Sequence, residues 1–200
     1  YLLTKLARNF KGKKFLRGHF GDDDGILLAS DRTPNLRGAL ATGFSAKYPS
    51  DQLSDLSRAL SKGQFDTLLV LGEDILDSGV TRDDLKGIKV VYLGTHRNET
   101  SALANVLIPT LTSFEKTGSF INRTFRLQSF KQAVPGPAGL LPDLHILASL
   151  INSLSEEGEQ SADLAQIWKQ LSKSATSIFH KLSFSSIPSD GFQSVSYTHL

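Results

Sequence analysis

The chain has 200 residues, of which 40% are hydrophobic and 21% charged, and its net charge is +2. This length suits one domain or a domain and a half, and so small a net charge gives no reason to expect a nucleic-acid partner. No stretch is long and apolar enough to predict a membrane span. Because the chain has no cysteine, these residues cannot supply thiolate ligands to an iron–sulfur cluster or a zinc ion.

Residues 1–20 are expected to contain the end of a helix, with one apolar side made of Leu2, Leu3, Leu6 and Phe10, followed by a loop. This loop carries a basic cluster that is followed at once by three acidic residues: Lys11, Lys13, Lys14 and Arg17, then Asp22, Asp23 and Asp24. Neighbouring blocks of opposite charge favour a solvated loop with compensating charges over a binding patch.

The next region, residues 21–154, alternates helical and strand signals. Ser50 is a candidate N-cap for a helix that Gly63 ends, and its apolar face is Leu53, Leu56, Ala59 and Leu60. Residues 65–71, 88–93 and 106–108 are short apolar runs typical of buried strands. Between the first two runs, Thr81 and Asp84 have capping-box spacing for a single helical turn ending at Gly87. The sequence therefore predicts an α/β fold with an open, mostly parallel sheet and flanking helices.

Residues 142–154 and 161–182 carry helical stripes, and we expect them to form a C-terminal helical pair. The second stripe consists of Leu164, Ile167, Trp168, Leu171, Ala175, Ile178, Phe179 and Leu182. A stripe with one tryptophan is typical of a core face. The polar linker at residues 155–161 is long enough for the second helix to fold back antiparallel on the first, which places the stripe in the core.

Two loops follow the predicted strands and are the first candidate site. Gly72, Glu73 and Asp74 come directly after residues 65–71, at the strand end where ligands of open α/β sheets bind. Two carboxylates there are poorly suited to a pyrophosphate. Thr95 and Asn98 follow the second strand and open a helix, whose N-terminus suits an anion. Either residue could instead simply cap that helix, and the capping interpretation is favoured.

The polar loop at residues 114–126 is the second candidate site. Gly118 is expected to need a positive φ, and Asn122 is able to close a turn on itself. Glu115 and Lys116 could include a catalytic acid, but adjacent opposite charges on a polar loop are usually structural. Arg126 is expected to begin an extended segment.

The order of residues 95–128, THRNETSALANVLIPTLTSFEKTGSFINRTFRLQ, resembles the molybdopterin oxidoreductase superfamily pattern ET…ADVVLP…EKxGTFxNxxGRxQ. The similarity continues through AVPGPAGLLPDLHILASLI, although Asn105 stands where the pattern has Asp. In that family the loop after the first strand lies near a pterin nucleotide, and the 114–126 loop shapes the cofactor cleft. The resemblance makes Gly72, Glu73, Asp74, Thr95, Asn98, Glu115, Lys116, Gly118, Asn122 and Arg126 candidate cleft positions, with no catalytic residue and no metal ligand among them.

A further stretch, DDDGILLASDRTPNLRGALATGF, resembles the large iron–sulfur subunit of bacterial NADH–quinone oxidoreductase, the enzyme also called respiratory complex I. The matching residues are Asp31, Pro34, Asn35, Arg37, Gly38 and Ala39. The resemblance implies a scaffold segment that binds no cofactor, with iron–sulfur clusters in a part of the protein N-terminal to it. It also implies partners among the other subunits of the peripheral arm, in a complex at the cytoplasmic face of the cell membrane.

Two alternatives stay open. One is a fragment of a catalytic molybdopterin enzyme such as a formate dehydrogenase or nitrate reductase, which would bind molybdopterin. The other is a stand-alone α/β nucleotide-binding module. We expect the chain to be a fragment whose C-terminal helix and tail occupy residues 155–194, because residues 195–200, VSYTHL, resemble a translated sequencing adapter.

Overall fold

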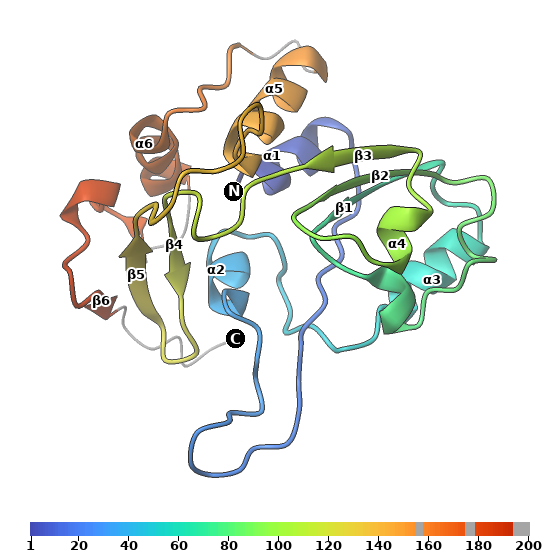
Figure 1. Ribbon diagram of the computed structural model, residues 1–200, viewed down its shortest axis with the longest axis horizontal. Coiled ribbons are helices and arrows are strands. Elements are labelled where there is room, and N and C mark those ends of the chain that lie inside the picture. Colours follow the sequence, from blue (N-terminus) through green and yellow to red (C-terminus); the bar gives the residue numbers. More distant parts are fainter. Residues whose placement is uncertain (155–157, 175–178, 194–200) are drawn as a thin grey trace.

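The structure is a computed structural model that describes residues 1–154, 158–174 and 179–193. Figure 1 shows its elements, where η marks a 3₁₀ helix: α1 (Leu2–Asn9), α2 (Leu36–Ala41), α3 (Ser54–Ser61), β1 (Thr67–Leu71), η1 (Ile75–Ser78), β2 (Lys89–Gly94), α4 (Glu99–Ala102), β3 (Val106–Pro109), β4 (Gly118–Ile121), β5 (Arg126–Phe130), α5 (Asp143–Leu154), α6 (Leu164–Ser174), η3 (Phe184–Ser186) and β6 (Phe192–Gln193). None of the described helices has the length and apolar character needed to cross a membrane.

The three predicted strands form a parallel sheet in the order β1-β2-β3. In its register, Val70 of β1 lies opposite Tyr92 of β2, and Tyr92 lies opposite Leu107 of β3. The α/β prediction is confirmed: helices flank this sheet, and two more lie near the C-terminus.

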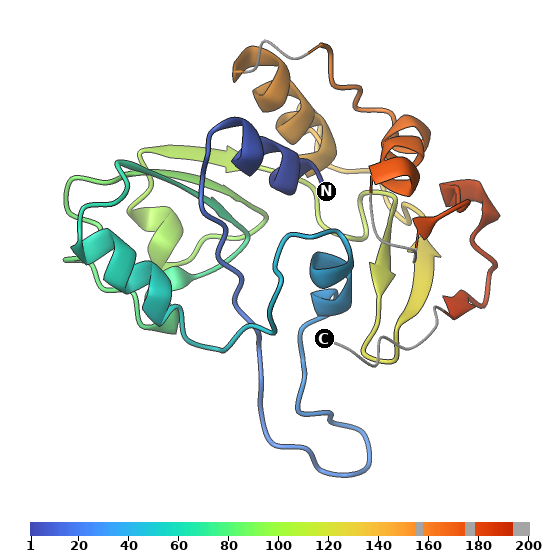
Figure 2. The same cartoon turned by 180° about the vertical axis from the view of Figure 1, so that it is seen from behind.

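Alternate residues of the strands face two separate apolar layers, as the pleat of a β-strand requires. Val70 and Tyr92 pack on one face with Leu56 of α3. Leu93 packs on the other face with residues of α1 and α5, including Ile151. Figure 2 shows α1 and α5 side by side. Phe10, which the sequence placed on the apolar side of α1, is 48% exposed because it follows the last turn of the helix.

Two predicted caps differ from the structure. Ser50 does not cap α3: its hydroxyl donates to the carbonyl oxygen of Gln52, and the helix begins only at Ser54. Thr81 and Asp84 do form the predicted reciprocal hydrogen bonds. The residues that follow Thr81 form hydrogen-bonded turns, however, and no helix. The helical turn between β1 and β2 is η1, which follows β1 directly.

A second, antiparallel sheet in the order β4-β5-β6 was not predicted. β4 lies inside the segment that the sequence indicated as a polar loop. The strand has four residues, of which only Ile121 is buried, so it leaves no strong alternation in the sequence. The rings of Phe120 and Phe130 pack across β4 and β5 with centroids 4.9 Å apart.

The stripe on α6 is buried, as predicted, but against a different surface. Trp168 and Leu171 pack with Ile121 and Leu127 of the antiparallel sheet. The expected packing of Trp168 and Leu171 against residues 142–154 is therefore wrong. α5 packs chiefly against α1, and α6 contributes only Ile167 to the apolar cluster that contains α5. Of the remaining predictions for this region, Ala175, Ile178, residues 155–157 and residues 195–200 lie outside the described part of the chain.

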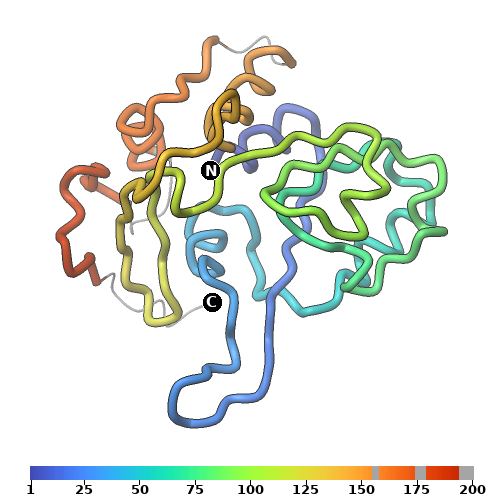
Figure 3. Tube along the Cα trace, in the orientation of Figure 1, coloured from blue at the N-terminus to red at the C-terminus, as the bar shows by residue number. Residues whose placement is uncertain are grey.

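Residues 18–33 form a loop that projects from the body (Figure 3). The loop is solvated, as predicted: residues 22–28 are exposed, and the three aspartates form no ion pair with the basic cluster among the described residues. Asp23 accepts a hydrogen bond from the N–H of Gly25, and one carboxylate oxygen of Asp24 accepts three, from the N–H groups of residues 26–28. Local hydrogen bonds of this kind satisfy Asx side chains within a turn.

Candidate functional site

The loops after β1 and β2 lie side by side, as predicted. The N–H of Gly72 donates to the carbonyl oxygen of Leu93 at 2.7 Å, which extends the pairing of the two strands by one residue. Gly72 has a φ of +69°, a conformation that favours glycine, and it turns the chain at once into Glu73 and Asp74. The two carboxylates therefore stand at the carboxyl end of the parallel sheet.

Glu73 is held by two residues from the N-terminal part of the chain. Its carboxylate accepts hydrogen bonds from Nη1 of Arg17 at 2.8 Å and contacts Nε2 of His19 at 2.9 Å. Arg17 also binds Asp77 and backbone carbonyl oxygens of the same loop. The side chains of Arg17 and Glu73 are only 10% and 24% exposed. Arg17 thus ties the N-terminal segment to the loop after β1, which sequence spacing did not indicate.

Asp74 caps α4 from outside the helix. Its carboxylate accepts hydrogen bonds from Oγ1 of Thr100 at 2.6 Å and from the N–H groups of Glu99 and Thr100 at 3.1 and 3.2 Å. Burial acts to raise the pKa of Asp74, but the hydroxyl and N–H donors outweigh it and the pKa is lowered. The carboxylate is therefore ionised at neutral pH and occupies the position that an anion would take at this helix end.

Asn98 is the N-cap residue of the same helix, which confirms the favoured capping interpretation for this residue. Its Oδ1 accepts from the N–H of Ser101 at 2.8 Å, and the Ser101 hydroxyl accepts from the N–H of Asn98 at 2.7 Å. Its Nδ2 donates to the hydroxyl of Tyr92, a buried residue of β2. Thr95, the other candidate, instead shares a hydrogen bond with Nδ1 of His96 at 2.8 Å.

The candidates of the second loop are engaged elsewhere. Glu115 accepts from the N–H and the hydroxyl of Thr112, and the N–H contributes most to lowering the pKa of this carboxyl group. Lys116 pairs with Asp143 at the start of α5, at 2.9 Å. Both side chains thus hold the connection between β3 and β4 in place. Among the described residues, neither forms a hydrogen bond or ion pair with the loops after β1 and β2.

Gly118 and Asn122 shape the hairpin of β4 and β5. The expected positive φ at Gly118 is wrong: a Cβ there would lie 2.7 Å from the ring of Phe130, so close packing and not φ explains the glycine. Asn122 closes the turn as predicted, because its Oδ1 accepts from the N–H groups of Thr124 and Arg126 at 3.0 and 2.9 Å. Arg126 begins β5, as expected.

The stretch at residues 31–39 packs against the antiparallel sheet. Asn35 accepts a hydrogen bond from the N–H of Ile121 in β4 at 2.9 Å. Asp31 forms an ion pair with Arg37, whose guanidinium lies over the rings of Tyr48 and Phe125 at 5.0 and 5.8 Å from their centroids. The sequence pattern singled out this stretch, whereas its contact with the hairpin could not be foreseen from spacing.

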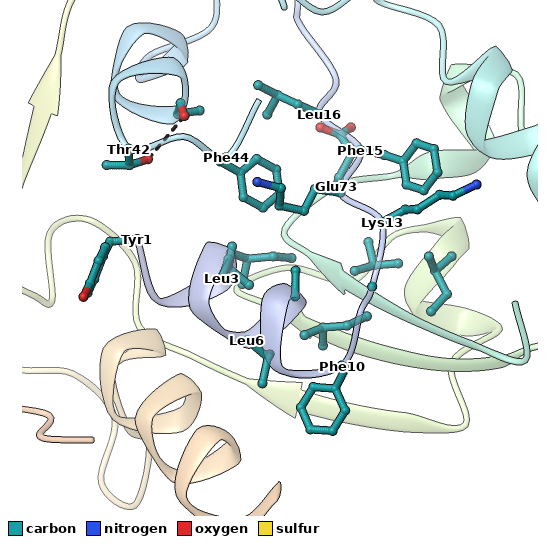
Figure 4. Close-up of a pocket in the computed structure, with 18 of the residues that line it drawn as sticks. Tyr1, Leu3, Leu6, Phe10, Lys13, Phe15, Leu16, Thr42, Phe44 and Glu73 are labelled. Carbon is teal, nitrogen blue, oxygen red and sulfur yellow. Dashed lines mark hydrogen bonds between the residues drawn. The ribbon is translucent and has the colours of Figure 1, made fainter. Parts of the chain in front are cut away.

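A cavity of about 1240 Å³ lies between the two sheets. Its walls are mainly apolar and include Leu3 and Leu6 of α1, Phe15 and all of β1, with Ile121 and Trp168 on the far side. Figure 4 shows Leu3, Leu6 and Phe15 around it, with Glu73 at its wall. Glu73 lines this cavity, whereas the other candidate cleft positions do not.

In the part of the chain that the structure describes, no three His, Cys, Asp or Glu side chains are grouped in a way that could hold a metal ion. A family model described as molybdopterin oxidoreductase matches residues 9–153, well over half of the chain. Comparison with curated proteins gives no significant match.

Proposed function

This chain belongs to the molybdopterin oxidoreductase family, and on that basis we propose that it is a scaffold segment of an oxidoreductase. The specific proposal is the large iron–sulfur subunit of NADH–quinone oxidoreductase, in the part that keeps the family fold without holding molybdopterin. Family members are oxidoreductases, so a role in an electron-transferring enzyme follows from the family itself. The finer assignment depends on the arguments below.

The observation that carries the proposal is the position of Asp74. A pterin dinucleotide brings a pyrophosphate, which would need free N–H donors or cations at the loops after the strands. At α4 the N–H groups of Glu99 and Thr100 already donate to the Asp74 carboxylate, and that of Ser101 donates to Asn98. A second carboxylate, Glu73, forms an ion pair with the guanidinium of Arg17. The residues present do not fit a pyrophosphate at this end of the sheet.

The stretch at residues 31–39 supports a scaffold role. Asp31, Asn35 and Arg37 match the pattern of the iron–sulfur subunit. Asn35 and Arg37 contact the hairpin, and Asp31 forms an ion pair with Arg37. The hydrogen bond of Asn35 with Ile121 and the ion pair of Asp31 with Arg37 help to fix the elements that they join, although Nε of Arg37 is buried without a hydrogen-bond partner. These three residues therefore serve the fold.

Under this proposal the iron–sulfur clusters are bound by a part of the subunit N-terminal to these residues. The partners are other subunits of the peripheral arm, and the complex stands at the cytoplasmic face of the membrane. The work of this segment is to present a stable surface to those neighbours.

Elemental analysis of the full-length protein tests the proposal. The protein is purified from its own cells grown with added molybdate, and iron and molybdenum are measured in the same sample. We expect several iron atoms per chain and no molybdenum. Stoichiometric molybdenum would contradict the proposal and would favour a catalytic enzyme of the formate dehydrogenase or nitrate reductase kind.

A calorimetric titration of the 200-residue chain with GMP and GDP tests the remaining alternative, a nucleotide-binding module. We expect no saturable heat. Saturable binding that Asp74→Asn strengthens would show that the carboxylate competes with a phosphate for the N-terminus of α4, and would argue against the scaffold assignment.

A further inference from the structure

The tip of the projecting loop at residues 18–33 carries three consecutive apolar side chains that the rest of the described chain leaves largely uncovered. Ile26, Leu27 and Leu28 are 85%, 89% and 52% exposed, and the loop stands away from the body of the molecule (Figure 3). Single exposed apolar residues are common on protein surfaces, whereas a consecutive run of them is unfavourable unless it serves an interaction. The tip is therefore a candidate contact surface.

Hydrogen bonds within the loop give the tip a defined shape. One carboxylate oxygen of Asp24 accepts from the N–H groups of residues 26–28 at 2.8 to 2.9 Å, and the N–H of Asp24 donates to the carbonyl oxygen of Leu28 at 3.2 Å. Closer to the body, an antiparallel bridge between Phe20 and Asp31 joins the two arms of the loop. A loop that already has its bound shape loses less conformational entropy on contact than a flexible one.

The charge beside the tip narrows the kind of surface that it fits. Residues 22–28 include three aspartates and no Lys, Arg or His. The aspartates form no ion pair among the described residues, and Arg32 at the base of the loop donates to a backbone oxygen, the carbonyl of Asp22. The cytoplasmic leaflet of a membrane is negatively charged and would repel such a tip. A protein pocket with an apolar centre and Lys or Arg at its edge complements both its apolar side chains and its charge.

We propose that Ile26, Leu27 and Leu28 dock into an apolar pocket, edged by lysine or arginine, on a neighbouring protein subunit. The proposal rests on the proposed function, which supplies such a neighbour in the peripheral arm of NADH–quinone oxidoreductase. The exposed carboxylates of Asp22 and Asp23 face the cationic edge, whereas Asp24 maintains the shape of the tip. Three side chains bury much less than the ~800 Å² per partner of a typical stable interface, so the tip is an anchor within a larger contact.

Site-specific photo-cross-linking in the full-length protein tests the proposal. The photoreactive residue p-benzoylphenylalanine is placed at Leu27, or at the exposed Lys62 after α3 as a control, and the protein's own cells are irradiated before purification. We expect the residue at position 27 to cross-link to one subunit of the co-purified complex. Mass spectrometry should locate the cross-link in an apolar site with Lys or Arg beside it. The residue at position 62 should not reach that site.

Two pairs of variants separate the roles of the apolar tip and of its charge. Leu27→Asp should lower the amount of the cross-linked subunit that the complex retains after extended washing by at least roughly tenfold, whereas Leu27→Met should retain it. Asp22→Lys should also lower retention, because it places like charges together, whereas the same change at the exposed Asp66 outside the loop should not. All four positions of change are exposed, so the melting temperature should stay unchanged.

The outcomes distinguish this proposal from the proposed function. If the subunits of NADH–quinone oxidoreductase co-purify but position 27 cross-links to lipid, to a second copy of the chain, to another part of the same chain or to nothing, the docking proposal is overturned. Unchanged retention in Leu27→Asp would overturn it as well. If none of those subunits co-purifies, the proposed function itself is contradicted, and the docking proposal is overturned with it.

Discussion

Replacing Trp168 by alanine is the sharpest test of how α6 contributes to the fold. Trp168 is only 4% exposed, and its indole packs edge-on against the ring of Phe179 with centroids 5.7 Å apart. It also packs against the ring of Phe184 and belongs to the cluster with Ile121 and Leu127. The side chain thus connects α6, the antiparallel sheet and the segment after residue 178.

The expected magnitude follows from the size of the side chain. Truncation of a buried Phe or Trp to Ala costs ~3–5 kcal/mol, because the lost contacts and the cavity left behind add together. For a domain of this size each kcal/mol lowers the melting temperature by ~2–4 °C, so Trp168→Ala should lower it by roughly 6–20 °C.

Differential scanning calorimetry of Trp168→Ala against the unmodified chain measures this effect. Phe114→Ala is the matched control, because Phe114 is also aromatic but 69% exposed, and its loss should change stability by less than ~0.5 kcal/mol. An unchanged melting temperature in Trp168→Ala, together with lost association with neighbouring subunits, would refute the assignment of this side chain to the core and show that it belongs to an interface.

Three smaller changes test single contacts. Asn35→Ala leaves the buried N–H of Ile121 without its acceptor and should cost ~1–3 kcal/mol in denaturant unfolding. The N–H of Thr81 and the hydroxyl of Ser61 lower the pKa of Asp84 to about 2, from ~3.9 in an unfolded chain. Its stabilising effect is therefore complete above pH ~3.9 and lost as the pH falls towards 2, so Asp84→Asn should be less stable at pH 7 and lose less stability between pH ~4 and ~2. Gly191→Ala should cost ~1–3 kcal/mol in the same unfolding assay, because φ is +88° there and a Cβ would lie 2.8 Å from a carbonyl oxygen of β5. Gly87→Ala, where φ is +78° with no atom within 4 Å, should cost less.

The parallel sheet could be predicted because residues from both faces of β1 and β2 pack into apolar layers. Burial of both faces leaves continuous apolar runs in the sequence, and residues 65–71 and 88–93 show them clearly. The capping role of Asn98 was also accessible, because capping depends on residues three positions apart.

The antiparallel sheet and the charge pairs could not be predicted, because they join residues that lie far apart in the sequence. β5 pairs with β6 through residues more than sixty positions apart, and β6 has only two residues. Arg17 meets Glu73 across a comparable separation, and no local pattern in the sequence indicates this pair. Local patterns report burial and capping, whereas the choice among distant partners is decided by the assembled fold.

The carboxyl end of the parallel sheet leads to one expectation for the proposed scaffold. At its carboxyl end, Glu73 and Asp74 hold Arg17 and the N-terminus of α4, so substitutions there should lower the free energy of unfolding before they affect any electron transfer.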